Sequence, residues 1–201
     1  MTDARRFAPA TARNREPIAA VLRDALPAEG IVLEIASGTG EHAIFLAQVF
    51  PGLVWLPSHP DPSAIASIRA WAERVRLPNL RPPLTIDAAT PDWPVDHADA
   101  MLCVNMVHIS PWDATVGLMR AAGKLLPPGA PLVLYGPYVQ QGVETAPSNL
   151  AFDADLRRRD ERWGLRRLED VVALAKGEGL RLEAVHAMPA NNLTVVLRRE
   201  G

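Results

Sequence analysis

The stretch IVLEIASGTGEHAIFLA, residues 31–47, contains the change of pattern that decides the fold. Its first part is a run of aliphatic residues that ends at Glu34, which is typical of a buried strand. The glycine turn GTG at 38–40 follows, and apolar residues at helical spacing come after it. The stretch therefore predicts a strand, a tight turn and a helix, in that order.

Strands and helices are expected to alternate along most of the chain. The predicted strands are apolar on both faces, which indicates a parallel sheet covered by helices on both sides. The last two strands have no helix between them, so they should form a hairpin, and the terminal strand should lie at an edge of the sheet and run antiparallel. The fold class predicted is α/β: a Rossmann-like three-layer sandwich with a seven-stranded, mostly parallel sheet. Strands are expected at 31–36, 53–56, 84–86, 99–107, 130–136, 180–188 and 192–199, and helices at 14–26, 40–49, 60–75, 112–126, 150–160 and 166–176.

Length and composition indicate one ordinary globular domain. The chain has 201 residues, of which 48% are hydrophobic, and a formal net charge of -2. We expect a flexible arm over 1–12 and a single domain over 13–201. The charge argues against a nucleic-acid partner, and no apolar run is long enough for a membrane span or a signal peptide, so a cytoplasmic location is expected. Cys103 is the single cysteine, and the five histidines show no metal-ligand spacing, so no metal site is expected.

The glycine turn has more than one possible ligand. Gly38, Gly40 and Ala43 match a dinucleotide fingerprint, and the N-terminus of the following helix offers N–H groups to an anion. However, a pyrophosphate would meet the carboxylates of Glu34 and Glu41. A ligand with an ammonium group, as in S-adenosylmethionine, would be attracted to Glu34.

Two stretches resemble the class I S-adenosylmethionine-dependent methyltransferases. VLEIASGTGEH resembles their motif I, E/D-x-G-x-G-x-G, with Ala36 in place of the first glycine, and KLLPPGAPLVLYG (124–136) is similar to the entry into their fifth strand. Six further stretches, covering almost the whole chain, resemble one subgroup, the DUF938 or methyltransferase-like 26 family. They are RNREPI (13–18), PSHPDP (57–62), NMVHISPW (105–112), SNLAFDADLRRRD (148–160), WGLRRLED (163–170) and MPANNL (188–193).

The resemblance implies S-adenosylmethionine as the cofactor and assigns residues to it. Glu34 would contact the methionine ammonium, directly or through water, and Asp87 would accept from the adenine amine. The end of the second strand should carry an acid for the ribose hydroxyls, but His59 stands there, so His59, Asp61 or a water would make this contact. The predicted cofactor residues are Arg13, Asn14, Glu34, Ala36, Ser37, Gly38, Gly40, His59, Asp87, Ala88, Asn105 and Met106.

His108 and Tyr138 are the predicted catalytic residues. His108 follows the fourth strand, beside the expected methyl group, and would act as a general base, although a histidine there also serves as a shape element. Tyr138 should face the same cleft after the fifth strand and contact the substrate. Arg13 would pair with a carboxylate of the cofactor or substrate if the N-terminal segment closes as a lid, or lie solvated on the surface.

The activity predicted from these residues is methyl transfer to a small molecule by in-line displacement, with the protein contributing mainly alignment. Two alternatives stay open. One is a non-catalytic module that binds a cofactor or a partner protein on the same fold, which Ala36 and His59 favour. The other is an NAD-dependent oxidoreductase, which His59 disfavours because an acid is expected at that position. The sequence names neither the methyl acceptor nor the oligomeric state.

Overall fold

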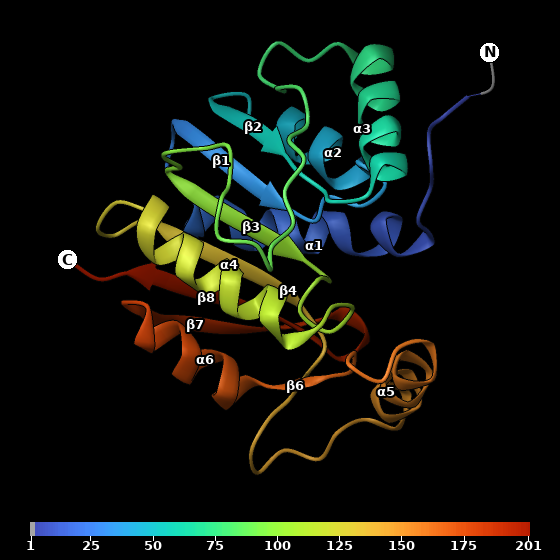
Figure 1. Cartoon of the computed structure of the whole chain (residues 1–201), viewed down its shortest axis with the longest axis vertical. Coiled ribbons are helices and arrows are strands. Elements are labelled where there is room, and N and C mark those ends of the chain that lie inside the picture. Colours follow the sequence, from blue (N-terminus) through green and yellow to red (C-terminus); the bar gives the residue numbers. More distant parts are fainter. Residues whose placement is uncertain (1–2) are drawn as a thin grey trace.

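A six-stranded sheet forms the centre of the molecule (Figure 1). The computed structural model describes residues 3–201. The strand order is β2-β1-β3-β4-β8-β7, and β8 is antiparallel to both of its neighbours. The strands are β1 (Gly30–Ile35), β2 (Leu53–Pro57), β3 (Ala100–Val104), β4 (Pro131–Gly136), β7 (Leu180–Met188) and β8 (Asn192–Arg199).

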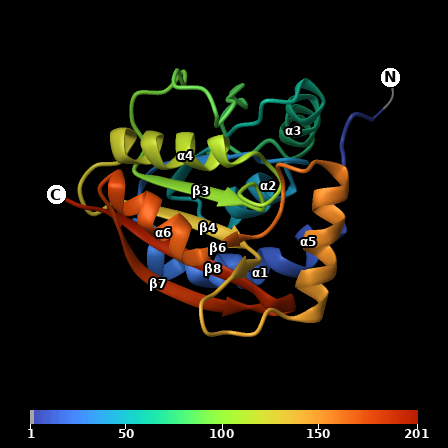
Figure 2. The ribbon, with the colours of Figure 1, turned by 60° about the horizontal axis from the view of Figure 1, so that its bottom comes forward.

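Helices cover both faces of this sheet (Figure 2). On one face, α1 (Pro9–Ala25) and α2 (Glu41–Val49) pack on Val32, Trp55 and Leu102. On the other, α4 (Trp112–Leu125) and α6 (Leu168–Gly177) pack on Ile35, Cys103 and Leu134. Alternate residues of β1, β3 and β4 therefore enter two separate cores, which explains why these strands are almost wholly apolar, whereas the edge strand β7 is mostly exposed. The predicted three-layer α/β sandwich is confirmed.

Two further helices lie beside the sheet. The helix α3 (Pro62–Val75) contacts α2, and α5 (Pro147–Arg159) stands apart at one end of the strands (Figures 1 and 2). A separate pair of short parallel strands is formed by β5 (Tyr138–Val139) and β6 (Arg166–Arg167), which precede and follow α5 in the chain. Chain order therefore places α5 and the turn after it at the end of the sheet where β1, β3 and β4 finish.

The predicted seventh strand at 84–86 is wrong, and so is the edge position expected for the antiparallel strand. Leu84 makes only an isolated bridge to Ser58, so the sheet has six strands rather than seven. The preceding residues Pro82 and Pro83 have no N–H to donate, which prevents a longer ladder. The antiparallel strand is the chain-terminal one, as predicted, but β8 lies inside the sheet and β7 forms the edge.

The N-terminal boundary also differs from the prediction. The helix α1 begins at Pro9 rather than at residue 14, so the expected boundary between arm and domain at residue 12 falls inside a helix, and Pro17 lies inside it rather than in its first turn. Side chains of α2 and α3 hold the segment before α1: Arg6 N donates to Ser67 Oγ (2.8 Å), and Ala8 N donates to Glu41 Oε2 (2.6 Å).

Within residues 3–201, no helix combines the length and apolar character that crossing a bilayer would need.

Gly117 of α4 packs closely against Ala88, in the segment that follows Leu84. A Cβ at this position would lie 1.8 Å from the Ala88 carbonyl oxygen. Gly117→Ala should therefore lower the free energy of unfolding by about 1–3 kcal/mol, because a backbone must shift, even though alanine favours a helix. Urea titration measures this change. Gly177→Ala, at the end of α6 with nothing within 4 Å, is the control and should not destabilise. Equal effects at both positions would contradict the packing argument.

Candidate functional site

A cleft of about 720 Å³ opens at the carboxyl ends of β1, β2 and β3. This is the position where open α/β sheets bind ligands, because the strand order reverses between β1 and β3. The structure brings nine of the predicted cofactor residues to its wall. They are Glu34, Ala36, Ser37, Gly38, His59, Asp87, Ala88, Asn105 and Met106.

The glycine turn has a left-handed backbone at alternate positions. Ala36 has φ 57°, Gly38 has φ 56° and Gly40 has φ 90°. Ser37 N donates to Ser58 O (2.8 Å), which fixes the turn to the end of β2. Ala36 thus keeps the conformation that a glycine would adopt more readily, at some cost in strain. Gly40, which was predicted to bind cofactor, does not line the cleft; it caps α2 and lies against Ile68, 3.0 Å from a Cβ built on it.

Glu34 is a buried carboxyl in the wall of the cleft. It is 1% exposed, and its Oε2 accepts a hydrogen bond from Trp55 Nε1 (2.6 Å). Burial raises the pKa of Glu34 to about 7, although the hydrogen bond from Trp55 opposes that rise. No cationic side chain within residues 3–201 is close enough to form an ion pair with it. A cationic ligand group in the cleft could therefore form an ion pair with the Glu34 carboxylate.

His59 lines the cleft with its hydrogen-bonding pattern fixed. Asp61 N donates to His59 Nδ1 (3.0 Å), so Nδ1 carries no proton and Nε2 carries the hydrogen of the neutral ring. Burial lowers the pKa of His59, which keeps the ring neutral at pH 7. Asp61 does not line the cleft: it caps α3, and its carboxylate accepts from Ser63 N (2.8 Å) and Ser63 Oγ (2.7 Å).

Two loops complete the part of the cleft nearest to these residues. Asp87 is exposed at the wall, and its Oδ1 accepts from Ala89 N (2.9 Å), while Ala88 is buried beside it. Asn105 follows the last residue of β3 and has φ 61°, a left-handed conformation that asparagine tolerates better than most residues. This turn directs Met106 into the cleft.

Arg13 and Asn14 do not line the cleft. Asn14 is buried and its Oδ1 is 2.8 Å from Nε2 of His42, a cleft residue that the sequence analysis missed. Burial lowers the pKa of His42 to about 4, so the ring is neutral and Nε2 donates to the amide oxygen. Its place in the first turn after the glycine motif was the available signal.

The structure does not place the predicted catalytic residues at the cleft. Ile109 N donates to Met106 O (2.9 Å), and this tight turn aims Met106 and Ile109 at the cleft and His108 away from it. His108 is 2% exposed and packs edge-on to Phe152, and burial lowers its pKa to about 4. Tyr138 is buried in the core on the α4 and α6 side, and burial raises its pKa. Neither side chain lines the cleft.

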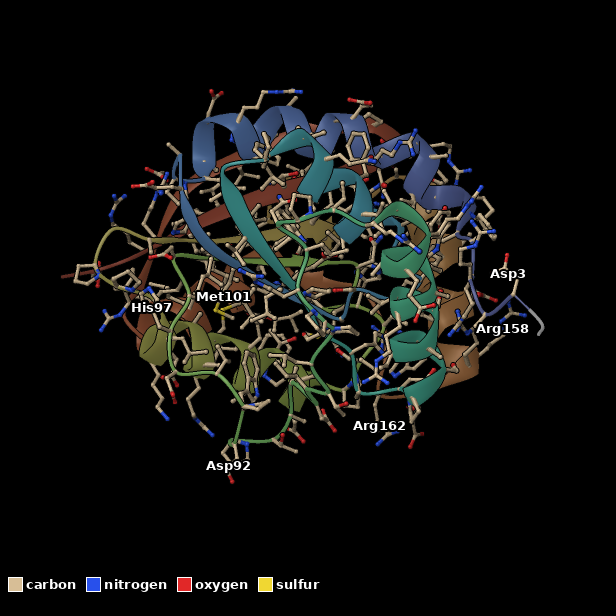
Figure 3. All side chains as sticks on the ribbon, turned by 90° about the horizontal axis from the view of Figure 1, so that it is seen from above. Asp3, Asp92, His97, Met101, Arg158 and Arg162 are labelled. Carbon is tan, nitrogen blue, oxygen red and sulfur yellow. The ribbon has the colours of Figure 1, made fainter. Side chains whose placement is uncertain are left out.

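The far end of the cleft is formed by residues outside the sheet. Asp160, Arg162 and Trp163 come from the turn after α5, and Ala8, Ala10 and Thr11 come from the start of α1. Arg162 donates twice to Asp160, through Nε (3.0 Å) and Nη2 (2.7 Å), and this lowers the pKa of Asp160 to about 2. In Figure 3, Arg162 projects at the rim of the molecule, whereas Met101 lies inside the sheet layer.

Comparison with known proteins gives a family and a fold. A family model described as "Protein of unknown function (DUF938)" matches residues 5–199. Mitomycin 7-O-methyltransferase MmcR has a similar structure, with a TM-score of 0.80 at 21% identity over 94% of this chain and 54% of that one. An O-methyltransferase family protein from Burkholderia thailandensis gives 0.79 at 15% identity, over 96% and 58%.

Human N-acetylserotonin methyltransferase, solved in complex with S-adenosylmethionine, gives a TM-score of 0.77 at 13% identity, over 96% of this chain and 53% of that one. The chain thus spans little more than half of the length of these proteins. At such identities the likeness establishes the fold alone, which this chain shares with these methyltransferases.

Glu34 should make the stability of the protein depend on pH. Its pKa is about 7 when folded and 4.5 in a model peptide, so the protonated form stabilises the fold fully below about pH 4.5, and this contribution is lost as the pH rises through 7. Between pH 5 and pH 8, the difference in unfolding free energy between wild type and Glu34→Gln should move by about 2–3 kcal/mol in favour of the variant. Urea titrations at both pH values measure it.

Glu73→Gln, at an exposed position of α3, is the matched control and should show no such pH-dependent difference. A constant difference between wild type and Glu34→Gln across this range would show that Glu34 is ionised throughout in the folded protein.

Proposed function

The chain belongs to the DUF938 family, and we propose that it is an S-adenosylmethionine-dependent methyltransferase acting on a small molecule. The observation that carries this proposal is Glu34, a buried carboxylate without a cationic partner within residues 3–201, at the end of β1 in the cleft of a methyltransferase fold. The methionine ammonium of the cofactor supplies the missing positive charge.

The residues of the cleft fit the other parts of the cofactor. Among residues 3–201, and apart from its two chain neighbours, the nearest atom to a Cβ built on Gly38 is Ala36 O at 3.9 Å, so its backbone can approach a ligand. Asp87 would accept from the adenine amine beside the small, buried Ala88, and Asn105 and Met106 would lie near the sulfur. When bound, S-adenosylmethionine supplies an electrophilic methyl group on its sulfonium sulfur.

The protein's contribution to transfer is placement. A nucleophile must approach the methyl group in line with the bond that breaks, and holding the two reactants in that geometry replaces a bimolecular encounter. The far end of the cleft, with Trp163 and Ile109 in its wall, would hold the acceptor. His108 and Tyr138 do not reach this space, so we assign the acceptor site to Thr11, Ile109 and Trp163 instead.

Calorimetric titration with S-adenosylmethionine, S-adenosylhomocysteine and NAD tests the cofactor assignment. We expect micromolar binding of both sulfur nucleosides and no binding of NAD, because a pyrophosphate would meet Glu34. Binding of NAD alone would overturn the proposal. Release of S-adenosylhomocysteine from the loaded protein in the presence of a small-molecule acceptor panel then tests for transfer itself.

The pH dependence of binding isolates the role of Glu34. An ammonium group beside Glu34 favours its ionised form, so binding must release a proton wherever the free protein holds one, below about pH 7. The affinity for S-adenosylhomocysteine should therefore rise roughly tenfold between pH 5.5 and pH 7. Adenosine, which lacks the ammonium, is the matched control and should show a smaller dependence. Parallel curves for the two ligands would contradict the contact with Glu34.

A further inference from the structure

The end of β2 offers a bound ribose a hydrogen-bond donor rather than an acceptor. Asp61 N already occupies the lone pair of His59 Nδ1, so Nε2–H is the polar group of this ring that remains for a ligand. The backbone that carries the ring is also restrained, since His59 N donates to Leu84 O (3.1 Å) and prolines lie on both sides at Pro57 and Pro60.

The carboxylate of Asp61 does not reverse this polarity. Ser63 N and Ser63 Oγ donate to its oxygens, and Arg6 Nη1 lies 3.7 Å from Oδ2. Asp61 is also absent from the wall of the cleft, whereas His59 lines it. An acid at the end of the second strand would accept from both ribose hydroxyls, and this chain offers no such acid there.

A second donor, the guanidinium of Arg6, lies beside Asp61 and Ser63, which follow His59 in the chain. The guanidinium of Arg6 has five N–H groups, and the structure assigns one of them to Ser63 Oγ (3.0 Å). Its backbone is fixed beside α3, since Arg6 N donates to Ser67 Oγ and Trp71 Nε1 donates to Arg6 O (3.1 Å). The half-exposed Arg6 side chain therefore lies beside Asp61, two residues after His59, although Arg6 does not itself line the cleft.

We propose that His59 holds the ribose as a hydrogen-bond donor through Nε2, and that this end of the cleft admits adenosine ligands whose ribose carries a 2′- or 3′-phosphate. A carboxylate at position 59 repels such a phosphate, while a neutral imidazole donor and a guanidinium attract it. This inference rests on the proposed function, because it takes the cleft to bind adenosine with its ribose at His59. It concerns which adenosine derivatives the chain binds, which the methyltransferase fold leaves open.

The test compares four probes on one protein: adenosine, adenosine 2′-monophosphate, adenosine 3′-monophosphate and adenosine 5′-monophosphate. Wild type should bind at least one of the 2′- and 3′-phosphates as tightly as adenosine. The 5′-phosphate carries the same charge at the other side of the ribose, towards Glu34, and should bind more weakly than adenosine. A preference for all three phosphates would reflect general attraction of anions and would overturn the inference.

Three variants identify the atoms responsible. His59→Asp should bind adenosine and S-adenosylhomocysteine more tightly, because its carboxylate accepts from both hydroxyls, and should bind the favoured phosphate about tenfold more weakly. His59→Gln keeps a donor and should retain the phosphate. Arg6→Gln should weaken phosphate binding and leave adenosine binding unchanged. Circular dichroism checks that each variant is folded.

The outcomes separate this inference from the proposed function. Absence of S-adenosylhomocysteine binding to wild type would overturn both. Normal S-adenosylhomocysteine binding together with rejection of both ribose phosphates by wild type would overturn the inference alone. A His59→Asp variant that loses affinity for adenosine and for the phosphate in equal proportion would do the same, because the change would then be structural rather than one of polarity.

Discussion

The carboxyl of Glu34, buried at the end of β1, constrains the residues around it. Glu34 follows the apolar residues of β1 and lies on the same face as Val32, where the sheet packs against α1 and α2. Taking a carboxylate out of water costs several kcal/mol unless partners replace the lost solvation, and the hydrogen bond from Trp55 replaces only part of it. Trp55 is itself fully buried, so the packing around its indole keeps Nε1 in position to donate to the Glu34 carboxyl. The fold thus maintains a site that a cationic ligand completes.

The positions of strands and turns could be predicted from the sequence, but the direction in which individual side chains point could not. The run 31–35, the glycine turn and the two final strands occupy the predicted places, because apolar periodicity and glycine encode them locally. Strand 84–86 failed because a ladder depends on neighbours as well as on its own residues. The direction of His108 could not be predicted either, because a four-residue turn decides which of Met106, His108 and Ile109 faces the cleft, and no periodicity describes that turn.

The hydrogen-bonding role of the site residues, donor or acceptor, could not be predicted from the sequence either. The sequence placed His59 correctly at the wall of the cleft, but whether it donates or accepts depends on Asp61 N, a backbone group two residues away. In the same way, Asn14 was singled out for the cofactor, yet its amide oxygen is bonded to His42. Tautomers and amide partners are set by three-dimensional contacts, which is why one sequence motif can carry opposite hydrogen-bonding roles.

The two halves of the cleft are supported differently. The half with Glu34, His59 and Asp87 is built on the ends of adjacent sheet strands and the loops that follow them, and hydrogen bonds such as Ser37 N to Ser58 O tie these loops to one another. The half with Trp163 is built on α5 and the start of α1, which lie outside the sheet. Arg166 donates from this region to Ser110 O (2.8 Å) and Val107 O (3.3 Å), and Gly164 N donates to His108 O (3.0 Å), so these hydrogen bonds connect the region to the loop after β3. Changes in the second half can therefore alter what the cleft accepts while the strand ends, and the charge of Glu34 with them, stay in place.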